Sequence, residues 1–267
     1  MAIKLLMVDL DDTLLGADIE ISAANRRALA EASRLGVSVT LASGRMFSSM
    51  RPYAEELGLG MPLIAYNGAL ARPLTGTDLW HHPLDSVTVV EILDRLSAQP
   101  TVVNLYLHDR LYVREMNQRV TAYGANARVQ ATPVGDLAAF LGAARPTKIL
   151  AIGEPAILKQ LCSTMGSAMA GRAEMAISKP HYLEIMAPGI SKGAALRHLV
   201  GYFNLDVSEV MAIGDGPNDL DMLCAAGIGV AVGNAPPEVL AGVKYVVSSS
   251  DHDGVAEAVE KFILSPA

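Results

Sequence analysis

The chain of 267 residues is long enough for one large domain or two, and its 51% of hydrophobic residues suffices for a sizeable core, which excludes a disordered protein. A net charge of −7 without a basic run, together with only 5% aromatic residues, argues against nucleic acid and anionic membranes as partners. The presence of only two cysteines predicts a cytoplasmic protein. Acids that follow the first apolar run argue against a signal peptide, and no apolar stretch reaches the ~18 residues of a membrane helix.

The first part of the chain alternates apolar strands with helices. In chain order, the pattern predicts a strand, a helix, a strand, a helix and a strand at residues 3–8, 22–35, 37–41, 47–57 and 63–66. Ser22 is suited to cap the first helix, and Gly36 and Gly58 are suited to end the two helices. Because the strands are apolar and separated by helices, they predict a parallel sheet buried on both faces.

The middle of the chain has a different pattern, in which strands occur in pairs. Helices are expected at residues 86–98, 115–123, 136–141 and 156–169, and strands at 102–108, 111–114, 148–152, 174–177 and 182–186. Two of the strand pairs are separated by short polar turns, which is typical of antiparallel hairpins. We therefore expect a mixed sheet with helices on one face, forming a separate α+β unit.

After residue 188 the simple alternation returns. The expected elements are a helix, a strand, a helix, two strands and a helix at residues 191–203, 209–213, 220–226, 228–232, 245–247 and 254–263. The predicted fold class is α/β, with a Rossmann-like doubly wound parallel-sheet core and an inserted α+β domain. The core is expected to be discontinuous, comprising residues 1–82 and 188–267, with the insertion at 83–187.

Two acidic motifs each follow a predicted strand. Residues 9–13, Asp-Leu-Asp-Asp-Thr, follow the first strand, and residues 214–219, Gly-Asp-Gly-Pro-Asn-Asp, follow the strand at 209–213. Because the carboxyl ends of parallel strands meet at one edge of the sheet, four carboxylates are expected on one rim: Asp9, Asp11, Asp215 and Asp219. These carboxylates repel one another unless a cation lies among them, and oxygen donors favour Mg²⁺. The alternative for residues 9–13 is a polar turn.

Two further motifs are suited to bind an anion. Residues 43–45, Ser-Gly-Arg, follow a strand and precede a helix, where a hydroxyl, a glycine and free N–H groups can surround a phosphate. Taken alone, this motif also fits an ordinary Ser-Gly turn. Lys192 lies in the first turn of a predicted helix, where acids are preferred, and so indicates a bound anion; a solvated surface lysine is the alternative.

The order of these motifs, Asp-x-Asp-x-Thr, Ser-Gly-Arg, Lys-Gly and Gly-Asp-x-x-Asn-Asp, resembles the haloacid dehalogenase-like superfamily. It is most similar to the Cof-type phosphatases, whose α/β cap domain is inserted between the second and third motifs. The resemblance covers nearly the whole chain, including residues 64–69 and 183–193. Two residues depart from the family pattern: Asp12 stands where many members have Gly, and Gly216 where many have Asn or Ser.

The resemblance implies a Mg²⁺-dependent phosphatase that hydrolyses small phosphomonoesters, such as sugar phosphates, through an aspartyl-phosphate. Asp9 would be the nucleophile, and Asp11 the acid that protonates the leaving group and then activates water. The implied metal ligands are the carboxylates of Asp9 and Asp215 and the backbone carbonyl of Asp11. The groups implied to hold the phosphate are the Leu10 and Gly44 N–H groups, Ser43, Lys192 and Asn218. The residues implied to support this set are Thr13, Arg45 and Asp219.

The expected partner is a small phosphorylated metabolite, and the sequence indicates no particular oligomeric state. Selection of the substrate is expected of the cap, where the candidates are His108, Asp109, Arg110, His181, Tyr182 and Glu184. A phosphomutase of the same superfamily stays open as an alternative. A dehalogenase is disfavoured by Asp11, because a halide leaves without a proton. A signalling domain that is switched by phosphorylation of an aspartate is disfavoured by the second acid and the large insertion.

Overall fold

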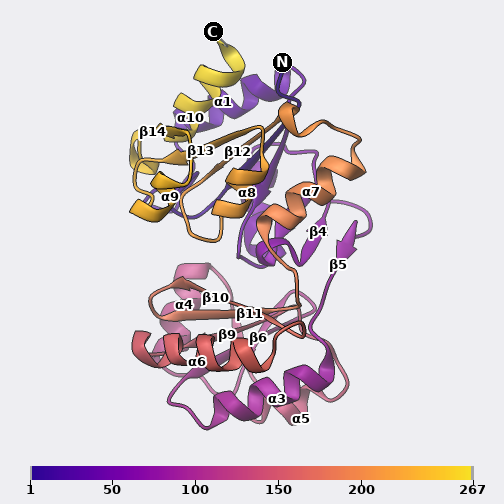
Figure 1. Cartoon of the computed structure of the whole chain (residues 1–267). Coiled ribbons are helices and arrows are strands. Elements are labelled where there is room, and N and C mark those ends of the chain that lie inside the picture. The colour runs from indigo at the N-terminus through magenta and orange to yellow at the C-terminus, as the bar shows by residue number, and fades with distance from the viewer. Residues whose placement is uncertain (1, 266–267) are drawn as a thin grey trace. The chain divides into compact units, whose positions relative to one another are not determined.

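The computed structural model describes residues 2–265, which form two compact units (Figure 1). One unit, called the core unit here, contains the described residues up to Gly44, Met50–Leu79 and those from Ser191 onward. The other, called the cap unit, contains Arg45–Ser49 and Trp80–Ile190. The α/β fold class predicted from the sequence is confirmed, whereas the predicted domain boundaries at residues 82/83 and 187/188 stay a prediction.

The larger sheet has eight strands in the order β14-β13-β12-β1-β2-β3-β4-β5. The strands are β1 (Leu5–Asp9), β2 (Ser38–Ala42), β3 (Leu63–Ala65), β4 (Leu70–Arg72), β5 (Trp80–His81), β12 (Val210–Gly214), β13 (Ile228–Val232) and β14 (Tyr245–Val247). Pairing is parallel from β14 to β3, and β4 runs antiparallel to β3. The chain thus starts at the centre, moves to β2 and β3 on one side, and later to β12, β13 and β14 on the other. In such sheets ligands bind beyond the strands' carboxyl ends where the direction reverses, which is here between β1 and β12.

Helices connect these strands and pack in pairs. The helices that contain residues of the core unit are α1 (Ala23–Arg34), α2 (Phe47–Glu56), α7 (Lys192–Tyr202), α8 (Leu220–Ala225), α9 (Pro237–Ala241) and α10 (Gly254–Val259), which continues into the π-helical segment η4 (Glu260–Leu264). Three short 3-10 turns are η1 (Tyr66–Gly68), η2 (Val207–Glu209) and η3 (Ser250–His252). Helix α1 packs on α10, and α7 packs on α8 (Figure 1). Ser22 caps α1 as predicted, because its side chain accepts a hydrogen bond from the Asn25 N–H.

The cap unit contains a six-stranded sheet in the order β10-β11-β9-β6-β7-β8. Its strands are β6 (Val102–Leu107), β7 (Arg110–Val113), β8 (Ala131–Pro133), β9 (Lys148–Ile152), β10 (Glu174–Lys179) and β11 (Tyr182–Met186), and its helices are α3 (Ser86–Ser97), α4 (Gln118–Ala127), α5 (Leu137–Leu141) and α6 (Pro155–Ala168). The pairs β6–β7 and β10–β11 are the predicted antiparallel hairpins. Apolar side chains of β6, β9 and β11 form one buried cluster with side chains of α3, α5 and α6.

The contact between α7 and α8 depends on a glycine and supplies a first prediction. A Cβ atom at Gly193, in the first turn of α7, would lie 2.7 Å from the backbone carbon and oxygen of Asp221 in α8. We expect Gly193→Ala to lower the free energy of unfolding by about 1–3 kcal/mol, because the two helices must separate to admit the methyl group.

Gly201 in the same helix is the matched control. Apart from its chain neighbours and the backbone of α7 itself, no atom of the described residues lies within 4 Å of the Cβ that an alanine would add there. Gly201→Ala should therefore raise the free energy of unfolding by up to about 1 kcal/mol through helix propensity. Urea unfolding of both variants measures the difference, and equal effects would contradict the close contact at Gly193.

Candidate active site

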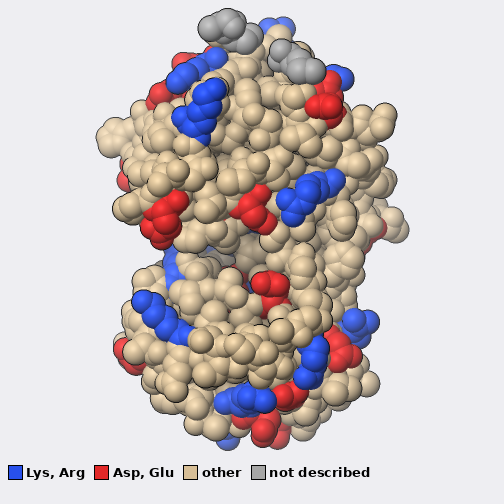
Figure 2. Space-filling view, in the orientation of Figure 1, with Lys and Arg blue, Asp and Glu red and all other residues tan. Residues whose placement is uncertain are grey.

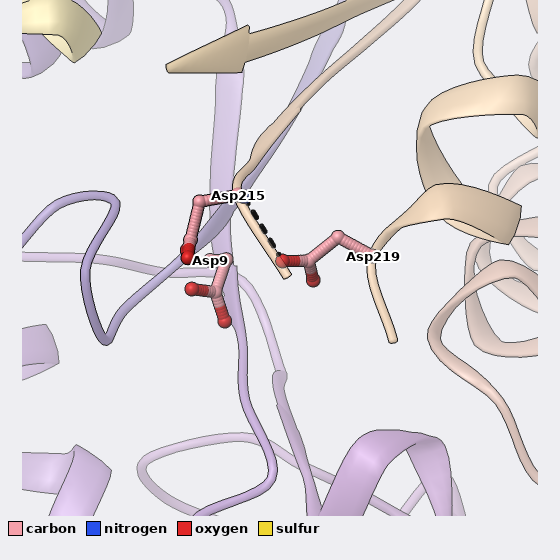
Figure 3. Close-up of side chains that lie close together, drawn as sticks. All are labelled: Asp9, Asp215 and Asp219. Atoms are coloured by element: carbon pink, nitrogen blue, oxygen red, sulfur yellow. Dashed lines mark hydrogen bonds between the residues drawn. The ribbon is translucent and has the colours of Figure 1, made fainter. Parts of the chain in front are cut away.

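Three carboxylates meet at the carboxyl ends of β1 and β12. Asp9 is the last residue of β1, and Asp215 directly follows β12, which is its parallel neighbour. Asp219 precedes the first residue of α8. One carboxylate oxygen from each of the three lies within 4.8 Å of the others, and Figure 3 shows the three side chains directed toward one another. The acids therefore gather at the reversal point of the sheet, where the doubly wound fold binds ligands.

Lys192 is buried among these acids. It is the first residue of α7, whose N-terminus is fixed by Ser191, because the Ser191 Oγ accepts a hydrogen bond from the Ala194 N–H at 3.0 Å. The Lys192 Nζ donates to Oδ1 of Asp9 and, at 2.5 Å, to Oδ1 of Asp219. The residue is only 1% exposed. A solvated surface lysine, the alternative considered for this position, is therefore excluded.

Burial shifts the proton affinities of this cluster. It raises the pKa of Asp9 well above the usual carboxyl value, and the negative charge of Asp219 raises that pKa further, against the opposing effect of Lys192. Burial also raises the pKa of Asp215 to about 6, although the hydrogen bond from Thr13 works in the opposite direction. For Lys192 burial alone would lower the pKa, but Asp219 and Asp9 outweigh it and the pKa rises. The site thus concentrates negative charge that a bound cation would stabilise.

Asp219 is held by hydrogen bonds on both of its carboxylate oxygens. While Oδ1 faces Lys192, Oδ2 accepts from the backbone N–H groups of Asp215 at 3.1 Å and Gly216 at 2.9 Å. Figure 3 shows the first of these two bonds as a dashed line. Asp219 therefore orients the loop that carries Asp215. Because Gly216 donates to Asp219 through its backbone N–H, this hydrogen bond does not require the Asn or Ser side chain that the resemblance leads one to expect at position 216.

The loop after β1 brings further predicted residues to the same edge. The Thr13 Oγ1 donates to Oδ1 of Asp215 at 2.6 Å. The Leu10 carbonyl accepts from the Leu14 and Leu15 N–H groups, so the chain turns immediately after Asp9. Asp12 has a φ of +62°, a left-handed conformation that Gly and, less readily, Asp adopt. This conformation gives a physical reason for the glycine that the resemblance implies at this position.

The Ser-Gly-Arg motif divides between the two units. Ser43 directly follows β2 and is buried, and its N–H donates to the Ile64 carbonyl at 2.9 Å. Gly44 also lies in the core unit, whereas Arg45 groups with the cap unit.

Asn67 also contacts this region but was not among the residues predicted for the site. Its Oδ1 accepts a hydrogen bond from Nδ2 of Asn218 at 3.1 Å. The Asn-Gly pair that directly follows the predicted strand at 63–66 is a turn signal, but it indicates the turn alone and not the contact with Asn218.

The residues proposed from the cap all lie in the cap unit, where His108, Arg110 and His181 are exposed and Asp109 and Tyr182 are half-buried. Glu184 is buried and accepts from Lys148 at 3.2 Å, Tyr182 stacks edge-on against Tyr123, and the His181 Nδ1 lies 3.0 Å from the Gly153 carbonyl oxygen. Their role in choosing a substrate stays a prediction.

Two properties of the surface bear on partners. On the face shown in Figure 2, acidic and basic side chains of the described residues are interspersed, without an extended basic region. Within residues 2–265, no helix is both long enough and apolar enough to cross a bilayer.

Comparison with known proteins identifies the class to which this fold and acidic cluster belong. Residues 6–259 match the family described as haloacid dehalogenase-like hydrolase, and the chain belongs to that family. A crystal structure of a haloacid dehalogenase-like hydrolase from Bacteroides thetaiotaomicron superposes with a TM-score of 0.88 at 29% identity, covering 97% of this chain and 98% of that one.

Curated relatives narrow the class to phosphatases. The chain is 29% identical to an HMP-PP phosphatase of Cronobacter sakazakii, over 97% of this chain and 95% of that protein. It is 28% identical to the 5-amino-6-(5-phospho-D-ribitylamino)uracil phosphatase YcsE of Bacillus subtilis, over 98% of this chain and 96% of that protein. The protein is accordingly a phosphatase of the haloacid dehalogenase-like superfamily, a phosphoric monoester hydrolase.

Proposed function

We propose that the protein hydrolyses small phosphomonoesters in a Mg²⁺-dependent reaction that passes through an aspartyl-phosphate on Asp9. The observation that carries the proposal is the position of Asp9. Its carboxylate ends the central strand at the reversal point of the sheet, close to Asp215 and hydrogen-bonded to a buried Lys192. A nucleophile, a metal-binding oxygen and a fixed positive charge are thereby available within one small space.

The residues at this edge fit a magnesium ion. The cluster offers carboxylate oxygens only, without cysteine or histidine, and burial raises the pKa values of Asp9 and Asp215. We propose that the carboxylates of Asp9 and Asp215 and the backbone carbonyl of Asp11 hold the ion. Bound Mg²⁺ supplies positive charge that reduces repulsion between the nucleophile and the phosphate. Because Asp219 is engaged by Lys192 and the 215–216 backbone, we assign it to the orientation of those groups.

In the proposed reaction, a carboxylate oxygen of Asp9 forms a bond to phosphorus while the bond from phosphorus to the ester oxygen breaks. The Asp11 carboxyl gives its proton to the departing ester oxygen. The Asp11 carboxylate then takes a proton from a water molecule, whose oxygen attacks phosphorus and releases phosphate and the Asp9 carboxylate. The phosphoryl oxygens are held by Lys192, Ser43, Asn218 and the N–H groups of Leu10 and Gly44.

The substrate proposed is a small phosphorylated metabolite. The names of the two curated relatives describe phosphorylated small molecules, and the two substrates differ from each other. A metabolite substrate also fits the cytoplasmic location expected from the sequence.

The experiment that tests the proposal measures phosphate release from a panel of phosphorylated metabolites. With millimolar Mg²⁺ we expect turnover of at least one phosphomonoester, and EDTA should lower kcat/KM by about 100-fold because several kcal/mol of charge stabilisation are lost. Added Mg²⁺ should also raise the thermal midpoint of unfolding, since it binds the folded state. Asp215→Asn should remove most of this thermal shift. Equal turnover in EDTA and Mg²⁺ would contradict the metal dependence.

The same panel separates hydrolysis from phosphoryl transfer within one sugar. Hydrolysis releases free phosphate in proportion to substrate consumed, whereas a phosphomutase forms an isomeric hexose phosphate without release. Isomer formation that exceeds phosphate release would contradict the proposed hydrolysis.

A further inference from the structure

The turn η1 (Tyr66–Gly68) has an unusual backbone directly after β3. Tyr66, Asn67 and Gly68 have φ angles of +52°, +54° and +108°. Left-handed backbone is uncommon outside glycine, and for a bulky residue such as Tyr66 it is a genuine outlier. Tyr66 and Asn67 are both buried, so the turn is enclosed by the structure around it.

Asn67 makes specific contacts with two of the loops proposed to hold the phosphate. Its N–H donates to the Ser43 carbonyl at 2.9 Å, and its Oδ1 accepts from Nδ2 of Asn218 at 3.1 Å. A Cβ atom on Gly44 would lie only 3.1 Å from the Asn67 Oδ1, so the glycine leaves the space that this oxygen occupies. One residue therefore links the loop after β2 to the loop after β12.

The glycine of the turn approaches the third such segment. A Cβ atom on Gly68 would lie 2.6 Å from the carbonyl oxygen of Ser191 and 3.1 Å from the Ala195 Cβ. Ser191 is the residue that caps α7 and precedes Lys192. The η1 turn thus lies against all three segments that carry Ser43, Lys192 and Asn218.

We propose that Asn67 is a positioning residue that acts through Asn218, an inference that rests on the proposed phosphatase function. The planar amide of Asn218 has two N–H groups in fixed directions. When Asn67 Oδ1 accepts one of them, the direction of the other is fixed as well, and that second N–H is the one proposed to hold a phosphoryl oxygen. Asparagine suits this position because it tolerates left-handed backbone and carries the acceptor, whereas glycine would supply the backbone alone.

A double-mutant cycle tests this role with p-nitrophenyl phosphate as substrate and inorganic phosphate as inhibitor. Asn67→Gly keeps the left-handed backbone and removes the acceptor. We expect Asn67→Gly to lower kcat/KM by about 10- to 100-fold and to weaken inhibition by phosphate. We expect effects of the same size from Asn218→Ala, which removes the amide. In the Asn218→Ala background, Asn67→Gly should add less than about a twofold effect, because the contact is already absent.

Asn204→Gly is the matched control. Asn204 is exposed and has a φ of +51°, so the same change is made at a left-handed position outside the site. Its kcat/KM should equal that of the wild type. A double variant whose loss in kcat/KM equals the product of the two single losses would overturn the proposed coupling. Unchanged kinetics of Asn67→Gly with a lowered thermal midpoint would overturn it as well. Failure of the wild type to release phosphate from any ester would instead contradict the proposed function.

Discussion

The Asp9→Asn variant is expected to lose turnover by a factor on the order of 10⁵ or more while remaining folded. An amide oxygen is a much poorer nucleophile than a carboxylate, and in the proposed reaction the Asp9 oxygen forms the bond to phosphorus. The change is nearly isosteric, and it removes the charge of a carboxyl group whose pKa is already raised by burial. Lys192 keeps Asp219 as its charged partner. Circular dichroism and the thermal midpoint check the fold, and phosphate release measures the activity.

Asp11→Asn is the matched variant for the proposed two-step reaction, because it leaves the proposed nucleophile Asp9 in place and removes the proposed acid. With an activated aryl phosphate, whose leaving group departs without a proton, the protein should become labelled on Asp9 and lose the label slowly. Asp9→Asn should take up no label from the same ester. Turnover in Asp9→Asn near that of the wild type, or label in both variants, would contradict an aspartyl-phosphate on Asp9.

The elements that were predicted best are those whose local signals agree with their tertiary surroundings. Ser22 and the spacing of the apolar residues after it indicate α1. The nearly unbroken apolar run near the start of the chain indicates β1. The strand β13 lies at 228–232, where it was predicted. In the cap unit, α4 begins at Gln118 rather than at 115, because the Asn117 side chain caps it by accepting from the Val120 N–H.

Three short strands that were not predicted owe their conformation to pairing with a neighbouring strand. The strands β4, β5 and β8 are two or three residues long and extend sheets at or near their edges, so their strand character comes from pairing rather than from local pattern. The same limit applies to the site. The motifs predicted that Asp9, Asp215 and Lys192 belong to one site. The contact of Asn67 with Asn218, by contrast, spans 151 positions and has no local sequence signal.

Lys192→Met is expected to weaken both activity and stability. The ammonium is one of the groups proposed to hold the phosphoryl oxygens, and loss of one such donor should lower kcat by about 10²- to 10³-fold. In the folded protein the same ammonium lies between Asp9 and Asp219, and all three side chains are buried. Its removal leaves two buried carboxylates without their cation, which should lower the free energy of unfolding by about 3–5 kcal/mol at neutral pH in EDTA.

The pH dependence of this loss distinguishes the charge of Lys192 from its packing. Burial already raises the pKa of Asp9 above its unfolded value, and removal of the opposing ammonium should raise it further. When the pKa of a carboxyl is higher in the folded than in the unfolded state, the protein keeps its full stability while that carboxyl is protonated. The free energy of unfolding then falls as the pH rises through the folded-state pKa. The destabilisation of Lys192→Met should therefore grow with pH above the ordinary carboxyl range. Lys4→Met, which removes an exposed partner of Glu209, should leave stability nearly unchanged at every pH. A pH-independent loss in Lys192→Met would mean that the side chain stabilises the fold by packing alone, since only a charge interaction changes as the carboxylates ionise.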